Sequence, residues 1–406
     1  MLTLDQFKEA RGVLQGVISQ TNLVYSRYFS QLCGNQVYLK PENMQVTGAY
    51  KIRGAYYKTT KLTEEQKGHG LITASAGNHA QGVAYAAKVA GVKATVVMPT
   101  TTPLMKVNHT KEYGAEVILH GAVFDDAADY AVKLAEKNGM TYIPPFNDLD
   151  IACGQGTIAY EIFQSLPDVD VILVPVGGGG LAAGVSTLAK LLNPHVRIIG
   201  VEPAGAASMK ASVEAGHVVS LPSAVTIADG VAVRTPGDVV FPYVQQNVDE
   251  FLTIEDDELV EAFLDIMENH KMVVENAGLL SVAALKQLND QGKNVVSILS
   301  GGNMDVITMS SLVQHGLISR GRVFTFSVML PDRPGELLHV AEIVARENGN
   351  IIKLDHNQFV NINRQSKVEL RVTLEAFGHE HKEAILEAMR KEGYHACLVD
   401  SKNIYN

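Results

Sequence analysis

The sequence predicts an α/β protein with two halves built on parallel sheets, followed by a smaller domain. From Gly48 to about residue 150, short apolar runs alternate with amphipathic segments, a pattern typical of βαβ units with parallel strands. A second set of buried strands is expected at 171–176, 196–203 and 295–300. After residue 322 the order changes to strand, helix, two strands, helix and strand within about eighty residues. That order predicts a split βαβ, or ferredoxin-like, domain.

Length and composition restrict the class of protein. A chain of 406 residues with 46% hydrophobic and 19% charged residues is expected to form two or three globular domains. The formal net charge of −10 argues against nucleic acid or an anionic membrane as the main partner. Cys33, Cys153 and Cys397 lie far apart and suggest neither a disulfide framework nor a metal site. The opening residues carry no signal-peptide core, so a cytoplasmic location is expected.

The elements follow in order along the chain. An opening helix is expected within residues 1–30, and a short strand at Gln36 to Lys40. In the first half, strands are expected in GLITASA, KATVVMP and AEVILHG, and helices in HAQGVAYAAKVA, LMKVNHTKEYG and FDDAADYAVKLAEKNG. We place the first region at 1–318, with a smaller subdomain at about 48–150 and a larger one from the remainder, and the C-terminal domain at 322–402.

Four consecutive glycines, Gly177 to Gly180, follow the apolar strand VILVPV, and a helix is expected from Leu181. Exposed backbone N–H groups at the start of a helix bind phosphate. An ordinary strand–turn–helix has the same pattern, so the glycines alone leave both readings open. No Gly-Lys-Ser/Thr follows, and the glycines lack the spacing of a dinucleotide site. A compact phosphate monoester is therefore favoured over a nucleotide.

Three further segments carry candidate chemistry. Lys51, in TGAYKIRGA, is expected near the amino end of a helix, where a desolvated lysine becomes an amine nucleophile able to form a Schiff base; the alternative is a surface lysine. SAGNHAQG, starting at Ser75, is either a binding loop or a helix start capped by Ser75 or Asn78. Ser300 ends a strand in SGGN. The histidines lack metal-ligand spacing, and His79 is expected to be a packed residue.

These four segments together resemble the signatures of the threonine dehydratase (threonine ammonia-lyase) family, with serine dehydratases and serine racemase as near relatives. The resemblance covers about residues 5 to 315. It implies a tryptophan-synthase-β-like fold (fold type II) and pyridoxal 5′-phosphate as the cofactor. The segment PDRPGEL, from Pro331 to Leu337, is similar to the ACT domain, a small amino-acid-sensing module, and the match rests on this segment and the element order.

The resemblance also implies roles for individual residues. Lys51 would hold the cofactor covalently and act as the base at the substrate Cα. Gly177, Gly178, Gly179 and Gly180 would bind the cofactor phosphate, Asn78 its ring hydroxyl, and Ser300 would face its ring nitrogen. Ser75, Ala76, Gly77, Asn78 and His79 would form the substrate site, with Ser75, Asn78 and backbone N–H groups holding the carboxylate. The implied reaction converts L-threonine into 2-oxobutanoate and ammonia, and L-serine into pyruvate.

Two rival functions stay open at this level: a serine racemase or another β-eliminating lyase that shares the cofactor residues, and a sensor without turnover. Serine racemase would have a serine at the position of Ala76, and alanine has no proton to give on the face opposite Lys51, so dehydration is favoured over racemisation. A sensor that kept the fold without turnover is the second alternative, but it does not explain why Lys51, Asn78 and Ser300 are all present.

Further expectations concern ions and partners. Glu202, Ala206 and Ser208 match cation-binding positions of relatives, but Ser208 replaces an acidic ligand, which favours a monovalent cation or a plain loop. Glu275 matches a glutamate near the cofactor ring, followed by Asn276 where the family more often has proline. We expect an amino-acid substrate, an amino-acid or nucleotide effector at the ACT-like domain, and a homodimer or homotetramer. Isoleucine biosynthesis and threonine breakdown both remain open as the physiological role.

Overall fold

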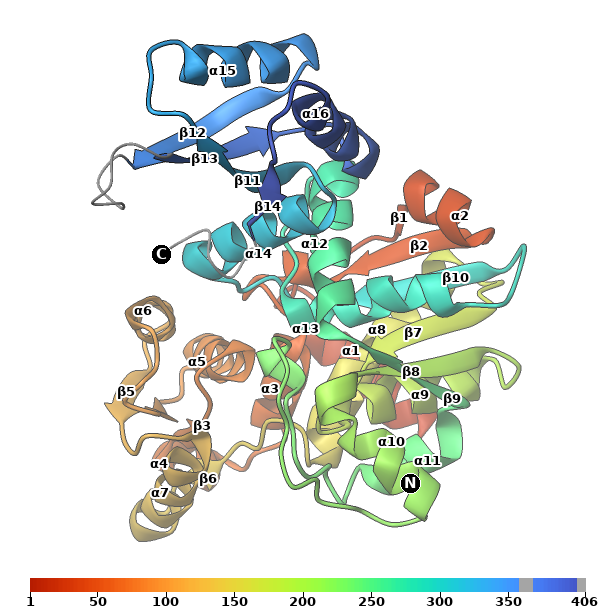
Figure 1. Cartoon of the computed structure of the whole chain (residues 1–406). Coiled ribbons are helices and arrows are strands. Elements are labelled where there is room, and N and C mark those ends of the chain that lie inside the picture. Colours follow the sequence, from red (N-terminus) through yellow and green to blue (C-terminus); the bar gives the residue numbers. More distant parts are fainter. Residues whose placement is uncertain (358–367, 400–406) are drawn as a thin grey trace. The chain divides into compact units, whose positions relative to one another are not determined.

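The computed structural model describes residues 1–357 and 368–399. Two compact units are present, Met1–Asp305 and Val306–Asn406 (Figure 1). The N-terminal unit contains one parallel and one mostly parallel sheet with helices around them, and the C-terminal unit contains one antiparallel sheet. The predicted α/β class and both sheets of the larger unit are therefore confirmed.

The larger sheet has the strand order β1-β2-β10-β7-β8-β9. Strand β1 is antiparallel to β2, and the other neighbours are parallel. The strands are β1 (Val24–Tyr25), β2 (Gln36–Pro41), β7 (Val171–Pro175), β8 (Arg197–Pro203), β9 (Glu250–Ile254) and β10 (Asn294–Leu299). All five residues of β7 are buried, as expected for a central parallel strand covered on both faces.

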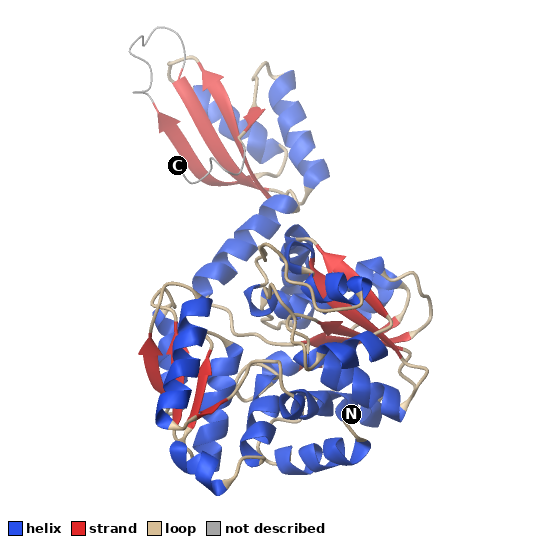
Figure 2. Ribbon diagram, turned by 90° about the horizontal axis from the view of Figure 1, so that it is seen from below, coloured by secondary structure: helices blue, strands red, loops and turns tan. Residues whose placement is uncertain are grey.

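Helices cover this sheet on both faces (Figure 2). They are α1 (Leu4–Leu14), α2 (Arg27–Cys33), α8 (Leu149–Ser165), α9 (Gly180–Leu192), α10 (Ser208–Ala215), α11 (Phe241–Asn247), α12 (Asp256–His270) and α13 (Asn276–Ala283), with short 3₁₀ turns η1 (Glu42–Met44), η2 (Ala204–Ala206), η3 (Asp229–Val231) and η4 (Ala284–Gln287). Helices α8 and α9 pack so closely that a Cβ at Gly184 would lie 1.9 Å from the carbonyl oxygen of Ala152. Glycine is required at that crossing.

The smaller sheet has the order β5-β4-β3-β6, with all strands parallel. Its elements are β3 (Leu71–Ala74), β4 (Ala94–Met98), β5 (Glu116–Leu119), β6 (Thr141–Tyr142), α3 (Lys51–Thr60), α4 (Glu64–His69), α5 (Asn78–Ala90), α6 (Leu104–Glu112) and α7 (Phe124–Asn138). Leu71 packs with residues of α5, whereas Ile72 and Ala74 pack with alanines of α7. Successive strand residues face opposite sides, so these two helices cover opposite faces.

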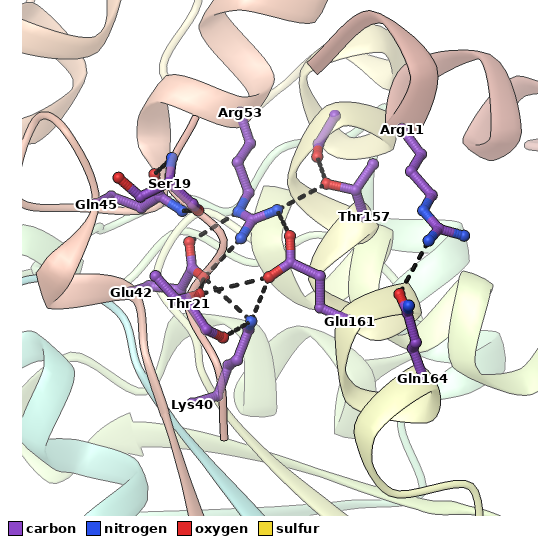
Figure 3. Close-up of polar contacts among 11 residues, drawn as sticks. Arg11, Ser19, Thr21, Lys40, Glu42, Gln45, Arg53, Thr157, Glu161 and Gln164 are labelled. Atoms are coloured by element: carbon purple, nitrogen blue, oxygen red, sulfur yellow. Dashed lines mark hydrogen bonds and ion pairs between the residues drawn. The ribbon is translucent and has the colours of Figure 1, made fainter. Parts of the chain in front are cut away.

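A buried ion cluster anchors the start of α3. Arg53 donates from Nε and Nη2 to the two carboxylate oxygens of Glu42, at 2.8 Å each, and from Nη1 to Glu161 at 2.6 Å (Figure 3). Lys40 pairs with the other oxygen of Glu161 and also donates to the carbonyl of Thr21. Burial opposes ionisation of Glu161, but Arg53 and Lys40 outweigh it and hold its pKa below the usual range. The cluster therefore has two cations and two anions and is balanced in charge.

The C-terminal unit begins with α14 (Val306–Ser319) and continues as β11 (Val323–Leu330), α15 (Glu336–Arg346), β12 (Asn350–Asn357), β13 (Val368–Glu375), α16 (His379–Lys391) and β14 (Cys397–Leu398). From β11 onward this is the predicted βαββαβ order, in an antiparallel sheet ordered β12-β13-β11-β14. Phe326 and Val328 of β11 join residues of both helices in one core, so both helices pack on the same face. The units divide at Asp305, whereas the domain limits 1–318 and 322–402 stay a prediction.

Among the described residues, no helix is both long and apolar enough to cross a bilayer. Cys33, Cys153 and Cys397 are all free thiols in this structure. Burial raises the pKa of Cys153 to about 12, so this thiol is not activated as a nucleophile.

Candidate active site

The four sequence motifs meet in the N-terminal unit. Ser300 directly follows β10, and its carbonyl accepts the backbone N–H of Tyr50 at 3.1 Å. Ala49 and Gly301 form an isolated antiparallel bridge beside it. A Cβ at Gly82, on α5, would lie 3.2 Å from the backbone of Lys51. Helix α3, which begins at Lys51, is therefore held between the SGGN and SAGNHAQG segments.

Lys51 is the first residue of α3, as the sequence predicts. Its Nζ donates a hydrogen bond to the carbonyl of Pro145 at 2.8 Å and lies 5.3 Å from the centre of the Tyr50 ring. Burial lowers the pKa of Lys51 to about 8, and the negative charge of Glu275 opposes that shift. The surface-lysine alternative is wrong, because this amine is desolvated and held at a fixed position.

The glycine run forms the start of α9, which begins at Gly180. Gly179 precedes it with φ of 99°, in the left-handed region, and no side chain caps the helix. A Cβ at Gly178 would lie 2.3 Å from the ring of Phe146, so glycine is required for this approach. The first N–H groups of a helix have no partner within it and carry partial positive charge. An uncapped start such as this fits a phosphate group.

A buried amide supports the phosphate assignment. Gln155, on α8, is fully buried, and neither Nε2 nor Oε1 has a hydrogen-bond partner among the described residues. Its Oε1 would lie 3.1 Å from a Cβ on Gly180, so the unpartnered amide borders the start of α9. Phe146 lies against Gly178, and its neighbour in sequence, Pro145, accepts the hydrogen bond from Lys51. The segment 145–146 therefore connects the glycine run to Lys51. Pro145, Phe146 and Gln155 are not predicted as site residues from the sequence; Asp148, which caps α8 through its side chain, is a local signal that identifies the start of that helix.

The start of α5 is a second uncapped helix end. Gly77 is its N-cap residue, and no side chain caps the helix. The hydroxyl of Ser75 accepts the N–H of Gly77 at 3.2 Å. The alternative of a start capped by Ser75 or Asn78 is therefore wrong, and the first-turn N–H groups can bind a carboxylate. Ala76 lies in the same partly exposed turn.

His79 is buried just inside α5. Its Nε2 lies 3.0 Å from the carbonyl of Ile143, so Nε2 carries the proton and donates it. Its Nδ1 is buried with no partner in the described part of the chain. Burial, followed by the charge of Lys51, lowers the pKa of His79 to about 3. This imidazole is therefore neutral at physiological pH.

Asn78 lies within a hydrogen-bonded network that the sequence motifs do not reveal. Its Nδ2 donates to Oε1 of Glu275 at 2.6 Å, and its Oδ1 accepts from Nδ2 of Asn303 at 2.9 Å. Burial raises the pKa of Glu275 to about 7; the charge of Asp229 adds to this shift, and the bond from Asn78 opposes it. Asn276, at the position expected to hold proline, donates to the carbonyl of Ile227 at 2.9 Å.

The expected cation ligands lie between the end of β8 and the start of α10: Glu202 is in β8, and Ser208 is the first residue of α10. Both carboxylate oxygens of Glu202 accept backbone N–H groups, from Met209 at 2.9 Å and Lys210 at 2.7 Å. Burial nevertheless raises the pKa of Glu202 to about 7. Ala206 lies in η2, and the buried hydroxyl of Ser208 has no partner among the described residues. Within those residues, no cluster of three His, Cys, Asp or Glu side chains could hold a metal ion.

Known proteins share this sequence and fold. A family model described as pyridoxal-phosphate dependent enzyme matches residues 14–301. The L-threonine ammonia-lyase of Thermotoga maritima is 42% identical over 400 residues, covering 98% of this chain and 100% of that protein. The processed form of threonine deaminase isoform 2 from Solanum lycopersicum superposes with a TM-score of 0.73 at 37% identity, covering 77% of this chain and 94% of that one. Maize serine racemase has the same TM-score at 34% identity, covering 78% and 98%.

These similarities confirm the predicted fold type and cofactor. The family match includes Lys51, Asn78, Gly177–Gly180 and Ser300, and the first relative is matched along its whole length. The chain belongs to the family of pyridoxal-phosphate dependent enzymes that includes these threonine ammonia-lyases and deaminases.

Proposed function

We propose that this enzyme dehydrates and deaminates L-threonine to 2-oxobutanoate and ammonia, and L-serine to pyruvate and ammonia. The observation that carries the proposal is a buried amine, Lys51, joined through Pro145 and Phe146 to one uncapped helix start, α9, and packed against a second, α5. Two anionic groups, a phosphate and a substrate carboxylate, can bind at these two helix ends. The named activities of the full-length relatives support this assignment.

Each side chain has a separate task in this proposal. Lys51 would hold the cofactor and would accept the proton from the substrate Cα. The N–H groups from Gly177 to Gly180 hold the phosphate, and those of Gly77 to His79, with Ser75, hold the carboxylate. Bound pyridoxal phosphate supplies an electron-accepting ring that stabilises negative charge at Cα. Ser300 offers that ring nitrogen a neutral hydroxyl. Loss of the β-hydroxyl as water leaves an enamine, and hydrolysis of its imine tautomer by one water gives the oxo acid and ammonia.

The deciding experiment measures oxo-acid release from L-threonine, with L-serine and D-serine in parallel and pyridoxal phosphate present. We expect rapid oxo-acid formation from the L-amino acids and slow racemisation, because Ala76 has no proton to give on the face opposite Lys51. Faster conversion of L-serine to D-serine than to pyruvate would instead identify a racemase, the activity named for maize serine racemase. A protein that binds cofactor but turns over none of these substrates would support the sensor alternative.

The pKa of Lys51 predicts how cofactor attachment depends on pH. With a pKa of about 8, about one tenth of the amine is uncharged at pH 7, against roughly 0.03% for an ordinary lysine. Because a lowered pKa makes the reactive form available at lower pH, the attachment rate should rise about fivefold between pH 7 and 8 and flatten above pH 8.5. Absorbance after mixing cofactor-free protein with pyridoxal phosphate measures this rate. A tenfold rise per pH unit continuing to pH 9.5 would contradict it.

Regulation and assembly complete the proposal. A cavity of about 330 Å³ surrounds Asp332, Arg333 and the rest of the PDRPGEL segment, and we assign it to an amino-acid or nucleotide effector. The assay repeated with isoleucine, valine and adenine nucleotides tests this, and no response to any would favour a purely oligomerising role.

Val306 and Ile307 are exposed on α14, which supports a homodimer or homotetramer, measurable by light scattering.

The buried hydroxyl of Ser208, which has no hydrogen-bond partner in the described part of the chain, supports a monovalent cation bound with Glu202 and the carbonyl of Ala206. The rate of oxo-acid formation, measured with K⁺ replaced by a bulky organic cation at constant ionic strength, tests this cation site, and we expect it to fall. We also propose a cytoplasmic location, which the number and spacing of the cysteines support.

A further inference from the structure

We propose that Asn303 is a positioning residue that sets the orientation of the Asn78 amide, so that Asn78 presents an N–H group to the cofactor. The proposal rests on the proposed function, in which Asn78 contacts the cofactor ring hydroxyl. It concerns a side chain in the SGGN segment, of which the sequence motif assigns a role only to Ser300.

The orientation of Asn303 follows from a backbone partner. Its Nδ2 donates to the carbonyl of Thr47 at 2.7 Å and to Oδ1 of Asn78 at 2.9 Å. A carbonyl oxygen can only accept hydrogen bonds, so the Asn303 atom facing Thr47 must be the nitrogen. Both hydrogens of that nitrogen are then used. The atom of Asn78 that faces Asn303 must therefore be its oxygen.

The other end of the Asn78 amide faces Glu275. The nitrogen of Asn78 donates to Oε1 of Glu275 at 2.6 Å, which leaves one N–H for a ligand. A flipped Asn78 would place its oxygen against the Glu275 carboxylate and its nitrogen against that of Asn303. Two contacts, one at each end, therefore favour the same orientation.

Glycines in the surrounding backbone make room for the side chains of Asn303 and Glu275. A Cβ at Gly48, where φ is 70°, would lie 2.4 Å from Oδ1 of Asn303. A Cβ at Gly301 would lie 2.3 Å from Oε1 of Glu275. Gly302 also donates its N–H to the carbonyl of Gly48 at 2.9 Å. The segment that carries Asn303 is thus joined to the turn before Lys51.

Asn303 fixes the orientation of the Asn78 amide at any pH, whereas the contribution of Glu275 depends on its protonation. Glu275 is near the charges of Asp229, Lys106 and Lys51, and its pKa is raised to about 7 by burial. A protonated carboxyl group can donate as well as accept, so it tolerates either orientation of Asn78. Without Asn303, the orientation of Asn78 would become dependent on the protonation of Glu275.

The test uses Asn303→Ala and the isosteric Asn303→Asp, each loaded with pyridoxal phosphate and titrated between pH 6 and 9 by absorbance. An N–H donated to the ring oxygen stabilises its ionised form. Its loss should raise the pH midpoint of the cofactor absorbance change by about one unit and lower kcat for L-threonine about tenfold. Either variant suffices if the other does not fold, because each removes both hydrogen bonds from Asn303.

The matched control is Asn43→Ala. Asn43 donates to the carbonyl of Val273 at 3.0 Å, and a Cβ at Gly302 would lie 3.0 Å from the Cβ of Asn43. Its loss removes a side chain–backbone hydrogen bond in the same region but neither of the hydrogen bonds that Asn78 makes with Glu275 and Asn303, so the wild-type midpoint is expected. An unchanged midpoint in the Asn303 variants, or an equal shift in Asn43→Ala, would overturn the positioning role. Failure of the wild-type protein to bind pyridoxal phosphate would instead count against the proposed function.

Discussion

Replacing Lys51 with alanine should lower oxo-acid formation from L-threonine by at least about 10³-fold, because one substitution removes both the attachment point and the base. The variant should also fail to retain pyridoxal phosphate through gel filtration. Loss of one flexible side chain at the first residue of α3 should leave the fold intact. Steady-state kinetics and the absorbance of the protein after gel filtration measure both effects.

Lys58 provides a control on the same helix. It pairs with Asp148 at 2.8 Å and with Asp150 at 2.9 Å, and it makes none of the contacts described at the active site. Lys58→Ala should retain cofactor and most of the activity. A Lys51→Ala variant that keeps a tenth of the wild-type rate would rule out Lys51 as the base.

Replacing Arg53 with methionine should destabilise the protein by about 3–5 kcal/mol, because it leaves Glu42 buried without its bidentate partner (Figure 3). Arg53, Glu42 and Lys40 are all fully buried, so solvent cannot compensate the lost charge. Urea unfolding followed by circular dichroism measures the change. The chain has no tryptophan, which makes fluorescence a weaker probe.

Two comparisons separate the charge effect from a loss of packing. Lys286→Ala breaks an exposed pair with Glu261, at 2.7 Å, and should cost no more than about 1 kcal/mol. The double variant Arg53→Met, Glu42→Leu removes one charge of each sign and leaves the Lys40–Glu161 pair intact. It should be more stable than Arg53→Met alone. A double variant less stable than the single one would show that packing dominates at this position.

Local patterns in the sequence were sufficient for much of the fold. The strands at Leu71–Ala74 and Ala94–Met98 and the helix at Phe124–Asn138 agree with their predicted runs within one or two residues, because hydrophobic periodicity is a property of neighbouring residues. The same holds for Lys51 and the glycines, whose positions at helix starts follow from short segments. Helix α8 was missed, since its buried, glycine-containing sequence lacks a clear polar face.

The sequence by itself determined the order of elements, the amine and the phosphate-binding glycines. Only the tertiary structure decided which side chains surround them. Asn78 and Glu275 are 197 positions apart, and Asn78 and Asn303 are 225 apart. Neither pair has a local signal, because the contacts form only when strands β3 and β10 bring their carboxyl ends into one unit. The pKa values of Lys51 and Glu275 depend on burial for the same reason: desolvation is created by packing and not by neighbours in the chain.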